Sequence, residues 1–192
     1  MEKLKQRILK DGKFYDEGII KVDSFLNHQM DTALLCDIGD EFYRIFKNCN
    51  VTKIVTVESS GIGIACITAH KFGNLPVVFA KKSTSKNLSD ETFSAKIHSF
   101  TKDIDYHARI DKNYISSNDR ILIIDDFLAN GEALLGLIDI INQAGAQIVG
   151  AGICIEKGFQ PGGDKIRTMG INLHSLAIID IDSNGKICFI DK

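Results

Sequence analysis

The thirteen residues from Ile121 to Ala133, I-L-I-I-D-D-F-L-A-N-G-E-A, constrain the fold more than any other segment of this chain. The four aliphatic residues at its start predict a buried strand of a parallel sheet, which the adjacent carboxylates Asp125 and Asp126 bring to an end. A turn at residues 129–131 and a helix over about 132–143 follow. A strand that leads into a helix through small residues leaves backbone N–H groups free at the helix start, and these N–H groups form a site for phosphate.

The order of these features suits a phosphorylated sugar. Carboxylates accept hydrogen bonds from a sugar diol but repel phosphate, so acids followed by a phosphate loop predict a site for a ribose 5-phosphate. The acid pair taken alone is equally consistent with a capping role. The full run resembles the phosphoribosyl pyrophosphate (PRPP) signature of the type I phosphoribosyltransferases. The resemblance implies that Asp125 and Asp126 bind the ribose hydroxyls and that a loop binds the 5-phosphate, namely Ala129, Asn130, Gly131, Glu132 and Ala133.

Hydrophobic periodicity along the rest of the chain alternates between strand and helix. This alternation predicts an α/β protein with a central parallel sheet flanked by helices. Ser183-Asn184-Gly185 lies between two apolar runs and predicts a hairpin turn. Helices are expected at residues 2–10, 31–47, 62–72 and 132–143, and extended segments at 19–22, 54–57, 77–81, 121–124, 149–155, 173–181 and 186–190.

The domain organisation follows from the resemblance to the type I phosphoribosyltransferase fold. One domain is expected over residues 1–192, with a core at about 31–156 and a small hood from about 1–30 and 157–192. Residues 83–114 do not fit the simple alternation and carry many hydroxyls and lysines. They predict an exposed, hairpin-like excursion that is either an ordinary surface insertion or, at about 83–101, a flexible lid over the reacting centre.

Polar residues that suit a pyrophosphate and a flat base follow the predicted strands. Ligands of open α/β sheets bind beyond the carboxyl ends of the strands. Ser59, Ser60 and Gly61 allow a close backbone approach to a pyrophosphate, and Lys82 supplies a cation. Lys157 can donate to a carbonyl oxygen, and Phe159 can stack on a heterocycle. Each of these is more often structural when it occurs alone, and together they predict one composite site.

Three segments narrow the resemblance to the bacterial xanthine phosphoribosyltransferases, a branch of this family: residues 21–29, 125–131 and 155–162. That branch transfers the 5-phosphoribosyl group of PRPP to N9 of xanthine, giving xanthosine 5′-monophosphate and pyrophosphate. The resemblance implies purine contacts at Ile20, Asn27 and Lys157, with the Asn27 amide donating to the 2-oxo group. It also implies a cytoplasmic homodimer, and Mg²⁺ bound through PRPP with no direct protein ligand.

The composition excludes several classes of function. A chain of 192 residues with 44% hydrophobic and 25% charged residues fits one soluble domain, and its net charge of -2 gives no reason to expect a nucleic-acid partner. No apolar run approaches the ~20 residues that span a bilayer, and the first ten residues lack the apolar core of a signal peptide. The five cysteines are scattered, as expected in a reducing cytoplasm, and the five histidines lack zinc-ligand spacing.

Two alternatives remain at this stage. A PRPP-sensing regulator needs an attached DNA-binding module, and residues 1–18 are too short for one. A phosphoribosyltransferase for guanine, hypoxanthine or adenine is the closer competitor. The related hypoxanthine–guanine enzymes place an aspartate where this chain has Ala129, which favours the xanthine branch. A nucleotide hydrolase is disfavoured because the chain has no G-x-x-x-x-G-K-[S/T] motif.

Overall fold

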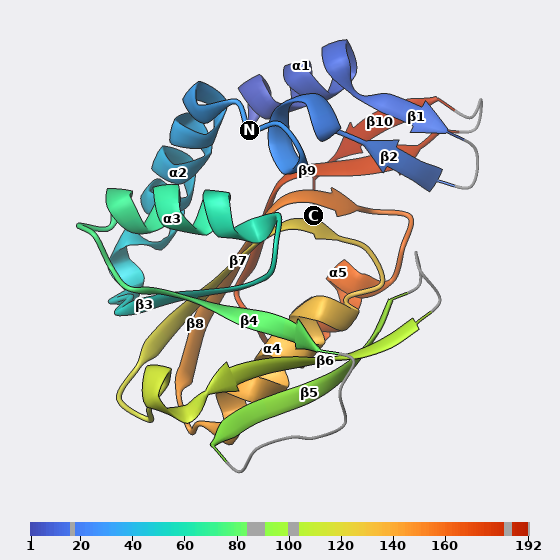
Figure 1. The fold of residues 1–192 in the computed structure, drawn as a ribbon. Helices are drawn as coiled ribbons and strands as arrows, with labels where there is room; N and C mark the ends of the chain where they lie inside the picture. Colours follow the sequence, from blue (N-terminus) through green and yellow to red (C-terminus); the bar gives the residue numbers. More distant parts are fainter. Residues whose placement is uncertain (16–17, 84–90, 100–103, 183–185, 192) are drawn as a thin grey trace.

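Helices and strands alternate along most of the chain, as the hydrophobic pattern predicts (Figure 1). The structure is a computed structural model and describes residues 1–15, 18–83, 91–99, 104–182 and 186–191. Each predicted helix and strand has a counterpart. β1 and α5 were not predicted, and β5 and β6 lie in the segment predicted only as an exposed, hairpin-like excursion. The elements are α1 (Glu2–Asp11), β1 (Lys13–Tyr15), β2 (Ile19–Lys21), α2 (Thr32–Phe46), β3 (Lys53–Val57), α3 (Gly61–Lys71), β4 (Val77–Ser83), β5 (Thr92–Ser99), β6 (Ile104–Asp111), β7 (Arg120–Leu128), α4 (Glu132–Gln143), β8 (Gln147–Lys157), α5 (Gly162–Thr168), β9 (Leu173–Ile181) and β10 (Ile187–Ile190).

The main sheet has the strand order β10-β9-β8-β7-β3-β4-β6-β5. The five strands from β9 to β4 in this order are parallel, which confirms the predicted parallel centre. β10 adds an antiparallel edge at one side, and β6 and β5 add an antiparallel pair at the other. Parallel neighbours need a crossover connection, which α3 supplies between β3 and β4 and α4 supplies between β7 and β8.

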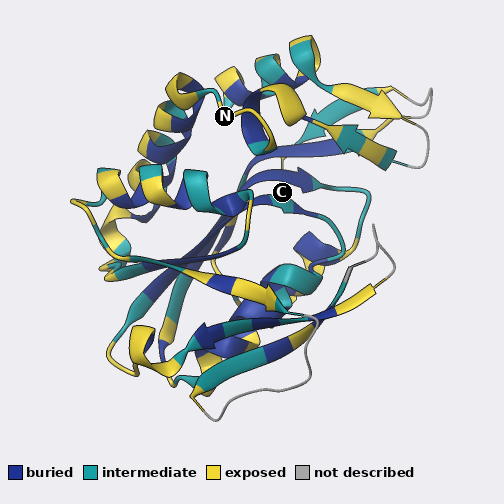
Figure 2. Cartoon of the chain, viewed as in Figure 1, coloured by how far each residue is buried: buried dark blue, intermediate teal, exposed yellow. Residues whose placement is uncertain are grey.

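The central strands separate two hydrophobic cores because successive side chains of a strand point to opposite faces. Ile54 and Leu122 pack on the face covered by α1, α2 and α3. Val55 and Ile123 pack on the other face, with the apolar residues of α4. Figure 2 shows the resulting pattern, with the middle of the sheet buried and the outer faces of the helices exposed. Burial on both faces explains why residues 121–124 are all aliphatic.

The segment predicted to be an exposed excursion instead forms part of the sheet. β5 pairs with β6, which in turn pairs with β4. Ala95 and Ile97 are buried, and a Cβ atom added at Gly136 of α4 would lie 2.5 Å from Cδ1 of Ile97. The hairpin is therefore packed on α4 rather than exposed. Residues 84–90 and 100–101 of the expected lid lie outside the described residues.

The N-terminal segment packs on the last two strands of the chain. Leu4 and Ile8 of α1 are fully buried in the same core as Leu176 of β9, and the Met1 ammonium donates to the Leu176 carbonyl oxygen. β9 lies beside β8 in the main sheet, so this strand of the expected hood is part of the central layer. The turn predicted at 183–185 lies outside the described residues.

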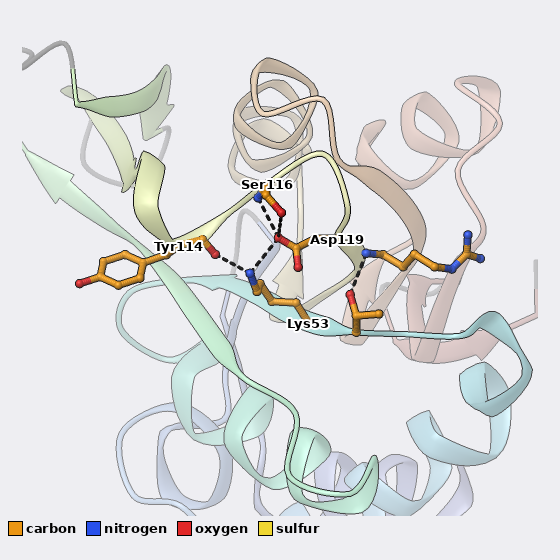
Figure 3. Close-up of polar contacts among 6 residues, drawn as sticks. Lys53, Tyr114, Ser116 and Asp119 are labelled. Atoms are coloured by element: carbon orange, nitrogen blue, oxygen red, sulfur yellow. Dashed lines mark hydrogen bonds and ion pairs between the residues drawn. The ribbon is translucent and has the colours of Figure 1, made fainter.

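An ion pair ties the amino ends of the central strands together, on the edge away from the polar loops (Figure 3). The Lys53 ammonium donates to Asp119 at 2.8 Å and to the Tyr114 carbonyl oxygen at 2.6 Å. Asp119 also accepts the Ser116 N–H at 2.8 Å. The Lys53 and Asp119 side chains are only 15% and 13% exposed. Burial raises the pKa of Asp119, but the hydrogen bonds from Lys53 and Ser116 outweigh it, and the net pKa is lowered.

Candidate active site

The carboxyl ends of β3, β4, β7 and β8 lie at one edge of the sheet because these strands are parallel. The segments that leave this edge contain most of the predicted site residues. One prediction is wrong in detail: Asp125 and Asp126 do not end their strand, because β7 continues to Leu128 and Asp125 is paired with Ile153 of β8. The acid pair is therefore held by the sheet, while residues 129–131 form the turn.

The two carboxylates are almost completely buried. Asp125 is 5% exposed and Asp126 is 8% exposed, and the Asp126 N–H donates to Oδ1 of Asp125 at 3.0 Å. Burial, and after it the charge of Asp126, raises the pKa of Asp125 well above its ordinary value, whereas the charge of Lys82 opposes this rise. Asp125 therefore keeps its proton at pH values where an exposed aspartate is ionised, and it can donate as well as accept a hydrogen bond.

Asn27 reaches the acid pair from the N-terminal segment. It ends a single π-helical turn at Asp23–Asn27, and its Nδ2 donates to Oδ2 of Asp126 at 3.2 Å. Its Oδ1 is buried and has no hydrogen-bond partner within the described part of the chain. An asparagine amide carries two N–H donors, so a bond to Asp126 leaves one donor and the oxygen for a ligand.

The loop after β3 lies directly against Asp125. A Cβ atom at Gly61 would be 2.1 Å from Oγ1 of Thr56 and 2.9 Å from Oδ1 of Asp125, so only glycine fits there. Oγ1 of Thr56 is buried without a hydrogen-bond partner among the described residues. The carboxylate of Glu58 accepts the Lys82 N–H at 2.5 Å, and the peptide bond from Glu58 to the next residue is cis. No role was predicted for Thr56 or for Glu58, although a threonine within an aliphatic strand was a visible signal.

The loop at 129–133 rests on the start of α5. Gly131 has φ +94°, a conformation that favours glycine. The Gly162 N–H donates to the Ala129 carbonyl oxygen at 3.1 Å, and a Cβ atom at Gly162 would be 2.2 Å from that oxygen. The first N–H groups of a helix have no partner within the helix, so those of α4 are available to an anion. Gly131 is buried and the other members are half-buried, namely Ala129, Asn130, Glu132 and Ala133.

Lys157 and Phe159 meet the N-terminal segment at Gly18. The Lys157 ammonium donates to the Gly18 carbonyl oxygen at 3.0 Å, and burial lowers its pKa. A Cβ atom at Gly18 would be 2.7 Å from the Phe159 ring, and Gly18 has φ +72°. Ile20 lies on β2, half-buried at the edge of the core. The residues predicted to bind the base thus fall into two groups, one around Gly18 and one at Asn27.

A separate groove lies away from these residues. Its lining includes Phe79, Lys81, Arg109 and Tyr114, from β4, β6 and the turn after β6. None of the predicted site residues lines it. The groove is therefore not part of the candidate active site.

Metal and membrane sites are not evident in the described ranges. Over residues 1–15, 18–83, 91–99, 104–182 and 186–191, no three side chains of the types His, Cys, Asp and Glu are grouped to hold a metal ion. No helix in the same ranges is both long enough and apolar enough to cross a membrane.

A family model described as phosphoribosyl transferase domain matches residues 29–172. The chain therefore belongs to the phosphoribosyl transferase domain family. It is 55% identical over 191 residues to a xanthine phosphoribosyltransferase of Ruminiclostridium cellulolyticum, which covers 100% of both chains. It is 57% identical over 180 residues to a xanthine phosphoribosyltransferase of Lachnoclostridium phytofermentans, which covers 94% of this chain and 92% of the relative.

Solved structures share the fold. The APRTase from Giardia lamblia, complexed with 9-deazaadenine, has a TM-score of 0.76 at 20% identity and covers 90% of this chain and 96% of its own. The adenine phosphoribosyl transferase from Trypanosoma brucei has a TM-score of 0.76 at 17% identity, with 95% and 82% covered. At these identities the likeness shows the fold, which confirms the predicted type I phosphoribosyltransferase architecture.

Proposed function

We propose that this chain is a purine-salvage enzyme that transfers the 5-phosphoribosyl group of PRPP to N9 of xanthine, giving xanthosine 5′-monophosphate and pyrophosphate. The observation that carries the proposal is the identity of 55–57% to xanthine phosphoribosyltransferases over almost the whole chain. The bond from Asn27 to Asp126 supports it, because it places a residue that can select a base beside one that can bind a ribose.

Asp125 and Asp126 bind the ribose hydroxyls in this proposal. Asp125, whose pKa is raised by burial, donates to or accepts from one hydroxyl, and Asp126 accepts from the other. The bond from C1 of the ribose to pyrophosphate breaks, the bond to N9 of xanthine forms, and the departing pyrophosphate takes up the imidazole proton that xanthine loses. Positive charge develops on the sugar ring as the first bond breaks and before the second is complete. The buried carboxylate of Asp126, held in place by the sheet, stabilises that positive charge more than water does.

The phosphates of PRPP lie at two loops. Residues 129–133 and the start of α4 bind the 5-phosphate, and Ser59, Ser60 and Gly61 bind the pyrophosphate beside Lys82. The acid pair supplies only two carboxylates, so the residues fit an Mg²⁺ ion held mainly by pyrophosphate oxygens of the substrate. When bound, the ion neutralises charge on the leaving pyrophosphate.

The base lies between Asn27 and the residues after β8. Lys157 donates to an acceptor on the purine, Phe159 stacks on its face, and Ile20 contributes packing. The free N–H of Asn27 donates to the 2-oxo group of xanthine, which hypoxanthine lacks. A buried donor left unpaired costs about 1–3 kcal/mol, which corresponds to roughly tenfold to hundredfold discrimination.

We propose in addition that the enzyme is a cytoplasmic homodimer. All five cysteines lie among the described residues and are free, which suits a reducing compartment. Phe79 and Tyr114 are exposed in the groove on β4 and β6, and subunit contacts typically bury side chains of this kind. Sedimentation equilibrium tests the dimer, and a monomer at assay concentrations would refute it.

The experiment that tests the activity is a steady-state assay with PRPP and Mg²⁺ against xanthine, guanine, hypoxanthine and adenine. We expect kcat/KM to be highest for xanthine by about tenfold or more. A preference for another base would refute the assignment of the base pocket and keep the PRPP site. PRPP binding without turnover of any base would favour a PRPP sensor instead.

A further inference from the structure

A buried ion pair lies behind the candidate site and takes no part in the proposed chemistry. Glu156, near the end of β8, is 1% exposed and receives a fork of two hydrogen bonds from Arg167 of α5, at 2.8 and 2.7 Å. The Ser175 hydroxyl of β9 donates to the same carboxylate at 2.5 Å. A buried carboxylate is costly unless it is paired and hydrogen-bonded, and a bidentate arginine also fixes geometry.

The start of α5 packs closely against this ion pair. A Cβ atom at Gly163 would lie 2.0 Å from Oε1 of Glu156 and 2.5 Å from Nη1 of Arg167. The backbone at the start of α5 therefore sits directly on the ion pair. Because α5 has few residues and few hydrophobic contacts, with Ile166 its one fully buried large side chain among the described residues, this pair is a main determinant of its position.

The start of α5 also contacts the 5-phosphate loop. Gly162 donates its N–H to the Ala129 carbonyl oxygen at 3.1 Å, and a Cβ atom at Gly131 would lie 3.2 Å from Cα of Gly162. Lys165 and Glu132 form a second, looser contact at 3.9 Å. A displacement of α5 would therefore displace the loop.

We infer that Glu156 and Arg167 are positioning residues that set the 5-phosphate loop at residues 129–133 relative to the base-binding Lys157. Glu156 directly precedes Lys157 in the chain, so one carboxylate fixes the place of a base residue and, through α5, the place of the phosphate loop. This inference rests on the proposed function. It assigns to the pair a role in PRPP binding that acts through the loop and not through contact with the substrate.

The test compares two ligands that use different loops. Calorimetry measures the binding of ribose 5-phosphate, and of pyrophosphate with Mg²⁺, to the full chain and to its Glu156→Gln variant. We expect the variant to bind ribose 5-phosphate about tenfold to hundredfold more weakly, because it loses hydrogen bonds to a charged group, and to bind pyrophosphate as the wild type does. Unchanged affinity for ribose 5-phosphate would overturn the inference, as would equal weakening for both ligands.

Two further variants separate positioning from general loss of stability. Asp119→Asn breaks the ion pair at the opposite edge of the sheet, and it should lower the melting temperature while leaving both affinities unchanged. A weakened affinity for ribose 5-phosphate in this control would overturn the inference. Arg167→Lys keeps the charge but loses the pair of parallel hydrogen bonds to Glu156, and it should weaken ribose 5-phosphate binding to a smaller degree. If Glu156→Gln does not fold, Arg167→Lys replaces it in the test. Unchanged affinity of Arg167→Lys for ribose 5-phosphate would overturn the inference. A wild type that binds neither ribose 5-phosphate nor PRPP would instead refute the proposed function.

Discussion

Replacing Asp125 by asparagine should make the protein more stable and, at the same time, much less active. The carboxyl group is 5% exposed, and burial together with the charge of Asp126 raises its pKa. Its ionised form is thus disfavoured in the folded state. Asparagine keeps the shape and the oxygen that accepts the Asp126 N–H, but it has no charge to desolvate.

The gain in stability must depend on pH. The folded pKa of Asp125 lies above the ordinary value of 3.8, so between these two pKa values the folded state retains a proton that the unfolded state has lost. Wild-type stability therefore falls as pH rises through this window, by up to about 1.4 kcal/mol per pH unit for one proton. The D125N variant has no proton to lose at this position. The amount by which its unfolding free energy exceeds that of the wild type should therefore grow with pH and become constant above the folded pKa of Asp125.

Urea unfolding of both proteins from about pH 4, close to the ordinary pKa of an aspartate, up to about pH 8 measures this difference. A variant that is less stable than the wild type at every pH, or a difference that does not change with pH, would refute the assigned ionisation. The D125N variant should also lose about a hundredfold or more in kcat/KM for PRPP, since Asp125 binds the reacting sugar in the proposed function. Full activity would remove Asp125 from the ribose site.

Three other substitutions test different parts of the structure. Asn27→Ala should lower the ratio of kcat/KM for xanthine over hypoxanthine by about tenfold or more, and an unchanged ratio would exclude Asn27 from base selection. Asp119→Asn should cost about 1.5–3 kcal/mol of unfolding free energy at neutral pH, as expected for a hydrogen bond to a charged group. The pKa of Asp119 is lowered in the folded wild type, so its contribution to the unfolding free energy is present above the ordinary value of 3.8 and is lost as pH falls through the folded pKa. Acid unfolding curves of the variant should show no such loss. Gly162→Ala would place Cβ 2.2 Å from the Ala129 oxygen, so kcat/KM for PRPP should fall on the order of a hundredfold while xanthine affinity changes less; equal effects on both substrates would contradict a role specific to the phosphate loop.

The parts of this fold that local sequence determines were predictable. The strand at 121–124 is aliphatic because it is buried on both faces, and the turn at 129–131 needs glycine because Gly131 has a positive φ. Each signal is contained in a few consecutive residues. The signature of the acid pair and the loop after it is equally local, so the type of site could be predicted before any contact was known.

Features that depend on distant residues were not predictable in the same way. The contact between Asn27 and Asp126 joins residues 99 positions apart, and nothing near either of them indicates the other. The sequence of β5 predicts an exposed insertion, because the burial of this strand depends on pairing with β6 and packing on α4. From the sequence alone, Glu156 is one more polar residue at the end of a strand. Its partner Arg167 comes from a short helix that the hydrophobic periodicity does not predict.

The ion pair of Lys53 and Asp119 has a consequence for how this protein can be altered. The amino ends of β3 and β7 are fastened there, and Arg120 adds bonds to Gln147 of β8 and to the Cys49 carbonyl oxygen. The opposite edge of the sheet, which bears the proposed ligand-binding loops, therefore does not have to supply this part of the stability of the sheet. Loops on a framework anchored elsewhere can be exchanged with little change in the framework, because distant sites contribute almost independently. A redesign of base preference should thus tolerate several simultaneous loop substitutions as long as the opposite edge is left intact.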